Sequence, residues 1–266
     1  MPLSVSRPIP LEKARAYRAG GWWLDLTLTD LLRRQVAERP GAPAVIAGDR
    51  TLTFVDVERE SDRVAAGLAR LGIGRGNVVS CQLENIPEAL ILQHAVAKRR
   101  AILNPIHPPY RAAEVERILA FAESRVMVVG PPARGFSYLE MVLGLRPRLS
   151  SLRHVVAVGD EGAPGALPFD ELSSSRGAHA AERSDPDDPF LLLFTSGTTD
   201  SPKAALHTHN MRIGNVRCVA EEIGFTGRDR FLSIARFSHL WGLCAYWMAL
   251  WNGAAHVLLE TFSPEA

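Results

Sequence analysis

Apolar residues in this chain alternate between helical spacing and short uninterrupted runs from about residue 28 onward. Leu28, Leu32 and Val36 share one helical face, whereas residues 78–83 and 126–129 form runs that indicate buried strands. Because these runs are continuously apolar instead of alternating with polar residues, we expect both faces of the sheet to be covered. The pattern predicts an α/β fold with mostly parallel sheets, covered by helices and joined by right-handed crossovers.

The composition changes between residues 160 and 189, where Gly, Ala, Ser, Pro and Asp dominate. Such residues are typical of a surface connection between two folded segments. We therefore expect an N-terminal α/β subdomain over residues 1–172 and a linker over 173–189. Residues 190–266 would then begin a second, incomplete α/β subdomain.

Charge and cysteine content exclude several classes of function. The chain carries 30 Lys and Arg against 29 Asp and Glu, a net charge of +1 with no basic stripe for nucleic acid or a membrane surface. Its three cysteines lie far apart, which indicates neither a disulfide framework nor a zinc site and favours a reducing, cytoplasmic location. No export signal and no metal-ligating set is predicted.

Residues 240–259 form a stretch of twenty residues without a formal charge, which is long enough to span a bilayer. Asn252 and Gly253 lie inside it, and Asn-Gly is a strong turn signal. We therefore predict a buried helix followed by a buried strand, with no membrane span.

The segment richest in chemistry follows the apolar run 190–194. It offers five hydroxyl groups, a glycine that lets the main chain approach a ligand, and a lysine at its end: Thr195, Ser196, Gly197, Thr198, Thr199, Ser201 and Lys203. Free amides, short hydroxyl donors and an ammonium group are the parts of a phosphate-binding loop. A solvated turn is the more common use of this composition. Pro202 predicts that a helix begins over residues 203–209, and neither a Walker loop nor a dinucleotide-binding glycine pattern occurs.

The string LLLFTSGTTDSPKAALHTHN resembles the phosphate-binding signature of the adenylate-forming (AMP-binding) superfamily, which includes acyl-CoA synthetases. Residues 74–85, Asn104-Pro105-Ile106 and residues 237–242 agree with the family in order. The segments GGWW, ILNPIHPPYRAAEVERILAFAESRVMVV and ARGFSYLEM are similar to carboxylate-CoA ligases for alicyclic acids such as cyclohexanecarboxylate, or for aromatic or medium-chain acids.

The resemblance implies a two-step ligase. A small carboxylic acid attacks the α-phosphate of ATP to form an acyl-adenylate, and CoA then takes the acyl group, with Mg²⁺ neutralising the phosphates. Carried over by position, the ATP phosphates would contact Thr195, Ser196, Gly197, Thr198, Thr199 and Lys203. The acid pocket would include His239, Trp241 and Gly242. The catalytic residue stays unassigned, because the lysine that assists adenylation in the family belongs to a C-terminal domain.

The chain departs from the family in extent and at single positions. It stops at Ala266, about where the first half of the family ends, so we expect it to be a poor ligase alone. Residues that usually are Gly or Pro are replaced at Glu84, Arg100, Asp200, Ala204 and Arg236. A charged Arg100 beside a buried strand must reach solvent or find a partner.

Two hypotheses follow from these departures. The first is an enzyme that needs a complementary C-terminal half. The second is a non-catalytic remnant that binds ATP or phosphate weakly or not at all.

Overall fold

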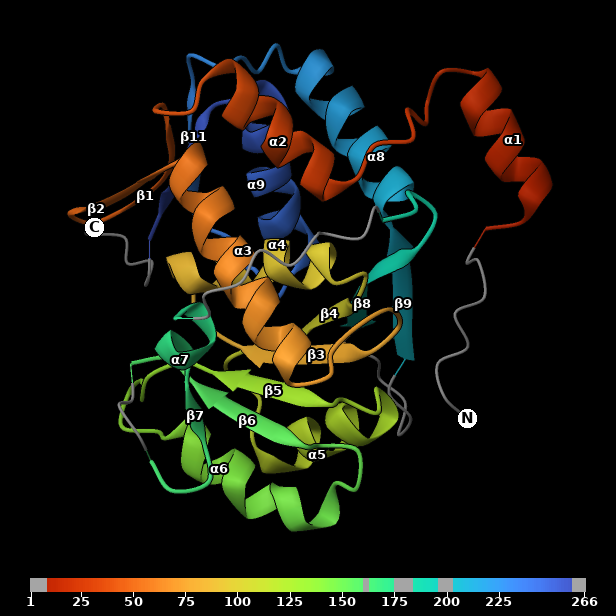
Figure 1. The fold of residues 1–266 in the computed structure, drawn as a ribbon. Coiled ribbons are helices and arrows are strands. Elements are labelled where there is room, and N and C mark those ends of the chain that lie inside the picture. The colour runs from red at the N-terminus through yellow and green to blue at the C-terminus, as the bar shows by residue number, and fades with distance from the viewer. Residues whose placement is uncertain (1–8, 160–162, 175–183, 196–202, 260–266) are drawn as a thin grey trace.

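The computed structural model describes residues 9–159, 163–174, 184–195 and 203–259. The predicted α/β class is confirmed, because the strands form two mostly parallel sheets with helices around and between them (Figure 1). The helices are α1 (Leu11–Ala19), α2 (Leu28–Glu38), α3 (Phe54–Arg70), α4 (Pro87–Lys98), α5 (Ala112–Phe121), α6 (Tyr138–Leu145), α7 (Phe169–Ser173), α8 (His209–Glu222) and α9 (Leu240–Asn252), with a 3₁₀ turn at Arg146–Arg148.

The larger sheet has seven strands in the order β7-β6-β5-β3-β4-β8-β9, and only β9 is antiparallel to its neighbour. The smaller sheet has the order β10-β11-β1-β2, with β2 antiparallel. The strands are β1 (Pro43–Ala47), β2 (Arg50–Thr53), β3 (Val78–Gln82), β4 (Ile102–Pro105), β5 (Val126–Val129), β6 (His154–Ala157), β7 (Leu167–Pro168), β8 (Pro189–Thr195), β9 (Lys203–Thr208), β10 (Arg230–Ser233) and β11 (Ala255–Leu258).

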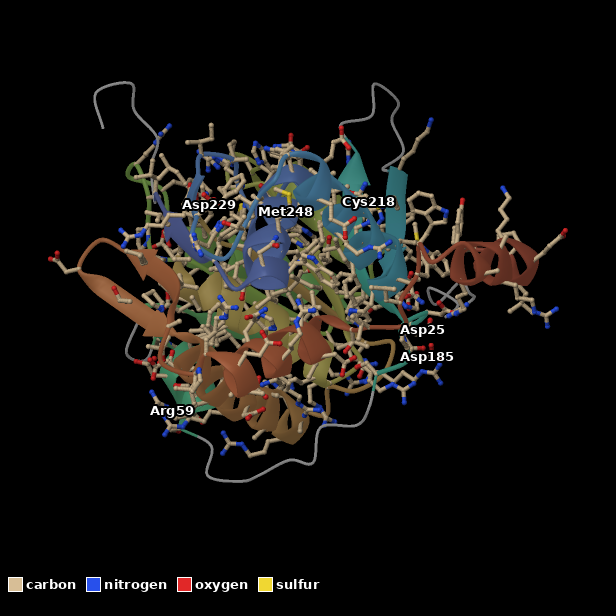
Figure 2. The ribbon with its side chains drawn as sticks, turned by 90° about the horizontal axis from the view of Figure 1, so that it is seen from above. Asp25, Arg59, Asp185, Cys218, Asp229 and Met248 are labelled. Atoms are coloured by element: carbon tan, nitrogen blue, oxygen red, sulfur yellow. The ribbon has the colours of Figure 1, made fainter. Side chains whose placement is uncertain are left out.

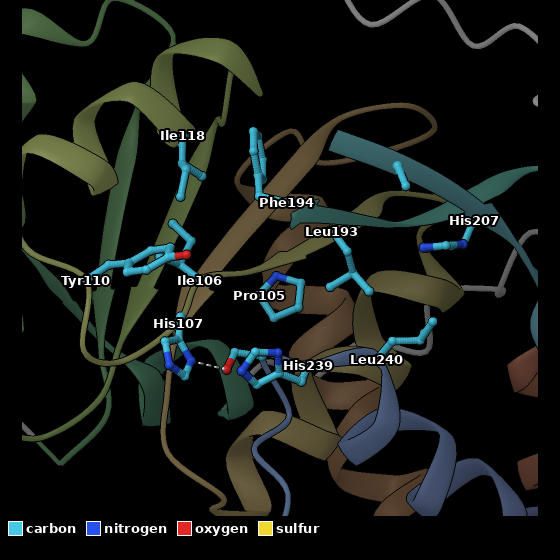
Figure 3. A pocket seen from close by; sticks show the side chains of 12 residues that line it. Pro105, Ile106, His107, Tyr110, Ile118, Leu193, Phe194, His207, His239 and Leu240 are labelled. Atoms are coloured by element: carbon cyan, nitrogen blue, oxygen red, sulfur yellow. Dashed lines mark hydrogen bonds between the residues drawn. The ribbon is translucent and has the colours of Figure 1, made fainter. Parts of the chain in front are cut away.

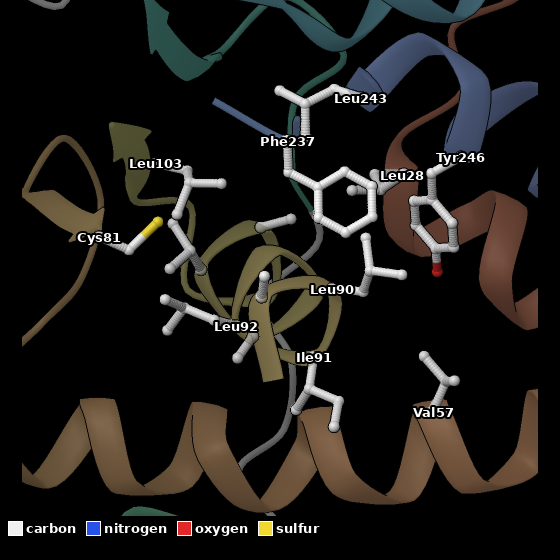
Figure 4. Packing of buried hydrophobic residues seen from close by; sticks show 14 of the residues in the cluster. Leu28, Val57, Cys81, Leu90, Ile91, Leu92, Leu103, Phe237, Leu243 and Tyr246 are labelled. Atoms are coloured by element: carbon white, nitrogen blue, oxygen red, sulfur yellow. The ribbon is translucent and has the colours of Figure 1, made fainter. Parts of the chain in front are cut away.

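Both faces of the larger sheet are buried, as the uninterrupted apolar runs predict. On β5, Val126 and Val128 join the core toward α3 and α4, whereas Met127 and Val129 join the core toward α5 and α6. Helix α4 lies in the first of these cores and buries every residue except Glu88 (Figure 4). Its apolar surface extends all round, because it is enclosed between the sheet and neighbouring helices.

The uncharged stretch 240–259 forms α9 and β11, and Gly253 ends the helix with a positive φ of 70°. A left-handed residue at this position closes a helix at little cost only when it is glycine. The predicted division into helix and strand is confirmed. No helix in the described part of the chain has the length and apolarity needed to cross a membrane. The expected cytoplasmic location stays a prediction.

One expectation about the region around residue 200 needs correction. Residues 203–208 form β9, which pairs with β8 over its whole length, so a helix does not begin at Lys203. The helix starts at His209, where the Thr208 hydroxyl accepts a hydrogen bond from the Met211 amide at 3.3 Å. Proline at 202 permits a helix, but pairing with the apolar strand β8 buries this segment instead.

The described end of segment 173–189, which we expect to be a surface connection, includes buried residues. Ser184, Asp187 and Asp188 are buried, and the Ser184 hydroxyl donates to the Ala97 carbonyl at 3.0 Å. Both sheets combine strands from before and after this segment. A division into subdomains 1–172 and 190–266 therefore stays a prediction about the order of segments along the chain.

Buried aspartates in this segment compensate the unusual Arg100. Arg100 has a left-handed φ of 53°, a conformation that favours glycine. Its Nη2 and Nε atoms donate to Asp188 at 2.7 and 3.0 Å, and Arg75 donates to the other carboxylate oxygen at 2.8 Å. Burial raises the pKa of Asp188, but these two arginines outweigh it and lower the pKa overall. Arg100 has thus found the partner that its position demands.

The neighbouring Asp187 anchors the N-terminal helix. Arg18 of α1 donates to Asp187 at 2.9 Å and to Asp25 at 2.8 Å, and Asn210 donates to both carboxylates. Asp25 lies where α1 joins the body of the protein (Figure 2). The network links α1, α8 and the segment before β8.

Candidate functional site

A cavity of about 410 Å³ opens at the carboxyl ends of β4 and β8. The loops that follow parallel strands meet at this edge of the sheet, which is where open α/β folds bind ligands. Figure 3 shows side chains from β4, α5, β8, β9 and the start of α9 around the cavity. It is lined by Pro105, Ile106, His107, Tyr110, Ile118, Leu193, Phe194, Ala205, His207, Ser238, His239 and Leu240.

Most of this lining is apolar, and the polar groups are neutral or weakly basic. Histidine rings, a serine hydroxyl and a tyrosine supply the polar atoms, whereas the described lining residues include no lysine, arginine or carboxylate. Such a cavity suits a compact apolar ligand with few hydrogen-bonding groups. A ligand with a second charge would find no counter-ion among these residues.

The polar wall is built by two histidines and a serine. The Nδ1 atom of His107 lies 2.9 Å from the Ser238 hydroxyl, and the rings of His107 and His239 lie edge to face with centroids 4.8 Å apart (Figure 3). Burial, followed by the neighbouring His239 and Arg236, lowers the pKa of His107. His107 is therefore uncharged at neutral pH, with one ring nitrogen engaged by Ser238.

His207 and His209, on either side of Thr208, have different surroundings. His207 points toward the cavity side of β9, and burial together with Arg212 lowers its pKa to about 4. His209 stacks on Phe190 with a centroid distance of 4.2 Å and accepts a hydrogen bond from the Leu28 amide. His209 is thus a core residue that fastens α2, whereas His207 belongs to the site.

The segment between β10 and α9 closes one side of the cavity and is held by Asn85. The Asn85 amide group donates to the Ala235 carbonyl at 2.9 Å and accepts from the Phe237 amide at 3.0 Å. Gly242 lets this segment lie against α9, because a Cβ atom there would stand 2.3 Å from the Arg236 carbonyl oxygen. The position of His239 at the start of α9 therefore depends on main-chain packing as well as on hydrogen bonds.

Two of the predicted phosphate-binding residues, Thr195 and Lys203, lie at the ends of β8 and β9. Thr195 of β8 directly follows the cavity residues Leu193 and Phe194 and pairs with Lys203 of β9. Lys203 is exposed. Ser196, Gly197, Thr198 and Thr199, with Asp200, lie outside the described residues.

The predicted acid-pocket residues have different positions. His239 lines the cavity, Gly242 packs behind it, and Trp241 points outward with 57% of its surface exposed. Their roles stay a prediction. Sequence reasoning missed His107, Tyr110, His207 and Ser238, although His107 follows the carboxyl end of β4, the usual place for a site residue in this fold class.

Comparison with known proteins identifies the family. Residues 32–266 match the model of the AMP-binding enzyme family, and the chain belongs to this family, whose enzymes use ATP. The predicted resemblance, including its nearness to ligases of aromatic and medium-chain acids, is confirmed.

One curated relative is the salicyl-AMP ligase / salicyl-S-ArCP synthetase of Mycobacterium tuberculosis, 32% identical over 267 residues that cover 97% of this chain and 47% of the relative. The medium-chain fatty-acid–CoA ligase of Escherichia coli is 26% identical over 263 residues, covering 96% of this chain and 46% of the relative. The apo structure of Mycobacterium smegmatis MbtA superposes with a TM-score of 0.89 at 31% identity, covering 99% of this chain and 49% of MbtA. The chain thus spans about half the length of these relatives.

Proposed function

We propose that this chain is the N-terminal part of an ATP-dependent ligase that converts a small carboxylic acid to its acyl-adenylate and then to its CoA thioester. The observation that carries the proposal is the shared hairpin. Leu193 and Phe194 of β8 line the cavity. The next residue, Thr195, pairs with Lys203 at the end of the hairpin. A nucleotide's phosphates at the hairpin end would lie next to an acid in the cavity.

The reaction requires the ATP phosphates and the acid to lie next to each other. A carboxylate oxygen attacks the α-phosphorus of ATP, and the bond to pyrophosphate breaks as the acyl-adenylate forms. Negative charge gathers on the phosphates, so the amides and hydroxyls of residues 195–199 and the Lys203 ammonium would stabilise it. A CoA thiolate then attacks the acyl carbon and AMP leaves.

Mg²⁺ would enter this reaction with the nucleotide. Among the described residues no group of three or more His, Cys, Asp or Glu is placed to hold a metal ion. ATP phosphate oxygens and water are the ligands that Mg²⁺ prefers. The metal would therefore add positive charge beside the phosphates, while the residues named above bind and orient them.

The cavity supports an acid with a compact apolar body. Ile106, Ile118, Leu193 and Phe194 offer the apolar contacts, and a volume of about 410 Å³ accommodates a single ring or a medium-length chain. The names of the relatives, a salicyl-AMP ligase and a medium-chain fatty-acid–CoA ligase, agree with these two kinds of acid. We propose aromatic, alicyclic or medium-chain monocarboxylic acids as substrates.

The alternative is a remnant that keeps the fold without the activity. Substitution of usual glycine or proline positions favours it, but Arg100 is matched by the buried Asp188 and does not break the fold. The ion pair makes Arg100 compatible with the fold, so this substitution by itself does not favour the remnant.

The proposal is tested by mixing the chain with a complementary C-terminal half of a family member and measuring pyrophosphate release. Benzoate, salicylate, cyclohexanecarboxylate and octanoate serve as the acids. We expect release that requires ATP, one of these acids and both halves. Absence of release with every acid would favour the remnant.

Replacement of Lys203 by alanine should weaken ATP binding by about 10- to 100-fold, because a charge-assisted hydrogen bond to phosphate contributes about 1.5–3 kcal/mol. Isothermal titration with ATP measures the change. Lys13→Ala, an exposed lysine on α1, is the matched control and should bind ATP as the unaltered chain does. Equal affinity in both variants would place the phosphates elsewhere.

A further inference from the structure

Two of the departures from the family pattern meet in space at the edge of the candidate site. Glu84 follows β3, and Arg236 follows β10, 152 positions later in the chain. The Nη1 atom of Arg236 donates to the Glu84 carboxylate, and the two side chains are 32% and 22% exposed. A half-buried pair of this kind is screened less by solvent than a fully exposed one.

The pair adds to the contacts that Asn85 makes with the same segment. Asn85, next to Glu84, binds the main chain at Ala235 and Phe237. Glu84 binds the side chain of Arg236, which lies between these two residues. Adjacent residues at the end of β3 therefore hold three consecutive residues of the segment that leads into α9.

This segment delivers two side chains to the cavity. The His239 amide donates to the Arg236 carbonyl at 3.0 Å, and Ser238 meets His107 at 2.9 Å. Movement of Arg236 would therefore carry His239 and Ser238 with it. Cavity walls must be held to within a fraction of an ångström if they are to select one ligand shape.

We propose that Glu84 and Arg236 are positioning residues for the cavity, and that their ion pair holds residues 234–239 so that Ser238 and His239 form its polar wall. The identity of the cavity as an acid pocket rests on the proposed function. The positioning itself does not, so the two are tested by separate measurements.

The positioning is measured by amide hydrogen exchange at Phe237 and His239 in Glu84→Gln, Arg236→Gln and the double variant. Each single change should speed exchange at both amides about 10-fold, and the double change should add less than a further 2-fold, because either change already breaks the pair. Glu60→Gln, which removes a carboxylate paired with Arg50 at 3.2 Å on another face, should leave both amides unchanged. Unchanged exchange in the single variants, or two full effects that multiply in the double variant, would overturn the proposal.

The pKa of His107 provides a second test, because it should change only if Glu84 and Arg236 lie close to the cavity. Arg236 lowers the pKa of His107 and Glu84 raises it. In histidine ring NMR spectra, Arg236→Gln should therefore raise the pKa of His107 and Glu84→Gln should lower it further. Identical His107 titrations in all variants would contradict a pair that faces the site.

Ligand affinity separates this inference from the proposed function. Benzoate is the probe, and each single variant should weaken its binding about 10-fold while ATP affinity stays within 2-fold. If the unaltered chain binds no benzoate, the acid-pocket assignment fails while the exchange data still decide the positioning. Benzoate binding that is equal in the unaltered chain and both variants would overturn the role of the pair in shaping the cavity.

Discussion

Three fully buried histidines that the fold holds neutral should together lower the free energy of unfolding by about 6 kcal/mol between pH 7.5 and pH 5. Burial lowers the pKa of His94 to about 3, with a further contribution from Lys98. Burial also lowers the pKa of His209 to about 4 and that of His256 to about 3. In the unfolded chain each takes up a proton near pH 6.5.

Stability falls with falling pH because the unfolded chain binds more protons than the folded protein. Above about pH 7 all three rings are neutral in both states, so their contribution to stability is fully present. Below pH 6.5 only the unfolded chain is protonated, and each ring costs about 1.4 kcal/mol per pH unit until its folded pKa is reached. Three rings together cost about 4 kcal/mol per unit, which is a large share of the 5–15 kcal/mol typical of a domain.

Urea unfolding at a series of pH values, followed by tryptophan fluorescence, measures this dependence. His256→Phe is the most informative variant, because neither ring nitrogen of His256 has a hydrogen-bond partner among the described residues and Phe231 stacks beside it. It should remove about a third of the slope. His154→Gln, at a half-buried histidine on β6, should change the slope much less. A stability that is flat between pH 7.5 and pH 5 would contradict neutral buried rings.

Gly242→Ala should lower the free energy of unfolding by about 3 kcal/mol and displace the segment that carries His239. The added Cβ atom would stand 2.3 Å from the Arg236 carbonyl oxygen and 2.8 Å from that of Ala235. Both obstacles are main-chain atoms, so a side-chain rotation cannot relieve the overlap, and overpacking of this kind costs about 1–3 kcal/mol or more. Thermal unfolding measures the loss of stability, and the NMR chemical shifts of the His239 ring report the displacement.

Gly144→Ala provides the control for Gly242→Ala. Gly144 lies in helix α6, and a Cβ atom there would meet nothing within 4 Å. Since alanine is the better helix former, this change should stabilise the protein by about 0.5–1 kcal/mol. Equal behaviour of the two alanine variants would show that the close approach at Gly242 is unimportant.

Local patterns predict most of the fold because local physics determines them. The helical face of Leu28, Leu32 and Val36 became α2, and Asn252-Gly253 ended α9 where turn chemistry requires it. Prediction failed where pairing with another strand decided the outcome. Residues 203–208 contain Ala, Leu and Lys, which suit a helix, yet pairing with β8 makes them a strand.

The site was predicted only in part for the same reason. The hydroxyl-rich string and His239 carry a local pattern, whereas His107 is meaningful only because the sheet brings it beside Ser238, 131 positions away. Arg100 with Asp188, and Glu84 with Arg236, look like isolated departures along the chain. Each acquires a partner only in three dimensions.

A crystal structure with a non-hydrolysable benzoyl-adenylate analogue, in which a sulfamoyl group replaces the phosphate, tests the central claim most directly. We expect the sulfamoyl group at the hairpin end between Thr195 and Lys203, and the benzoyl ring between Leu193, Phe194 and His239. An analogue bound elsewhere, with the cavity empty and the hairpin end untouched, would contradict it.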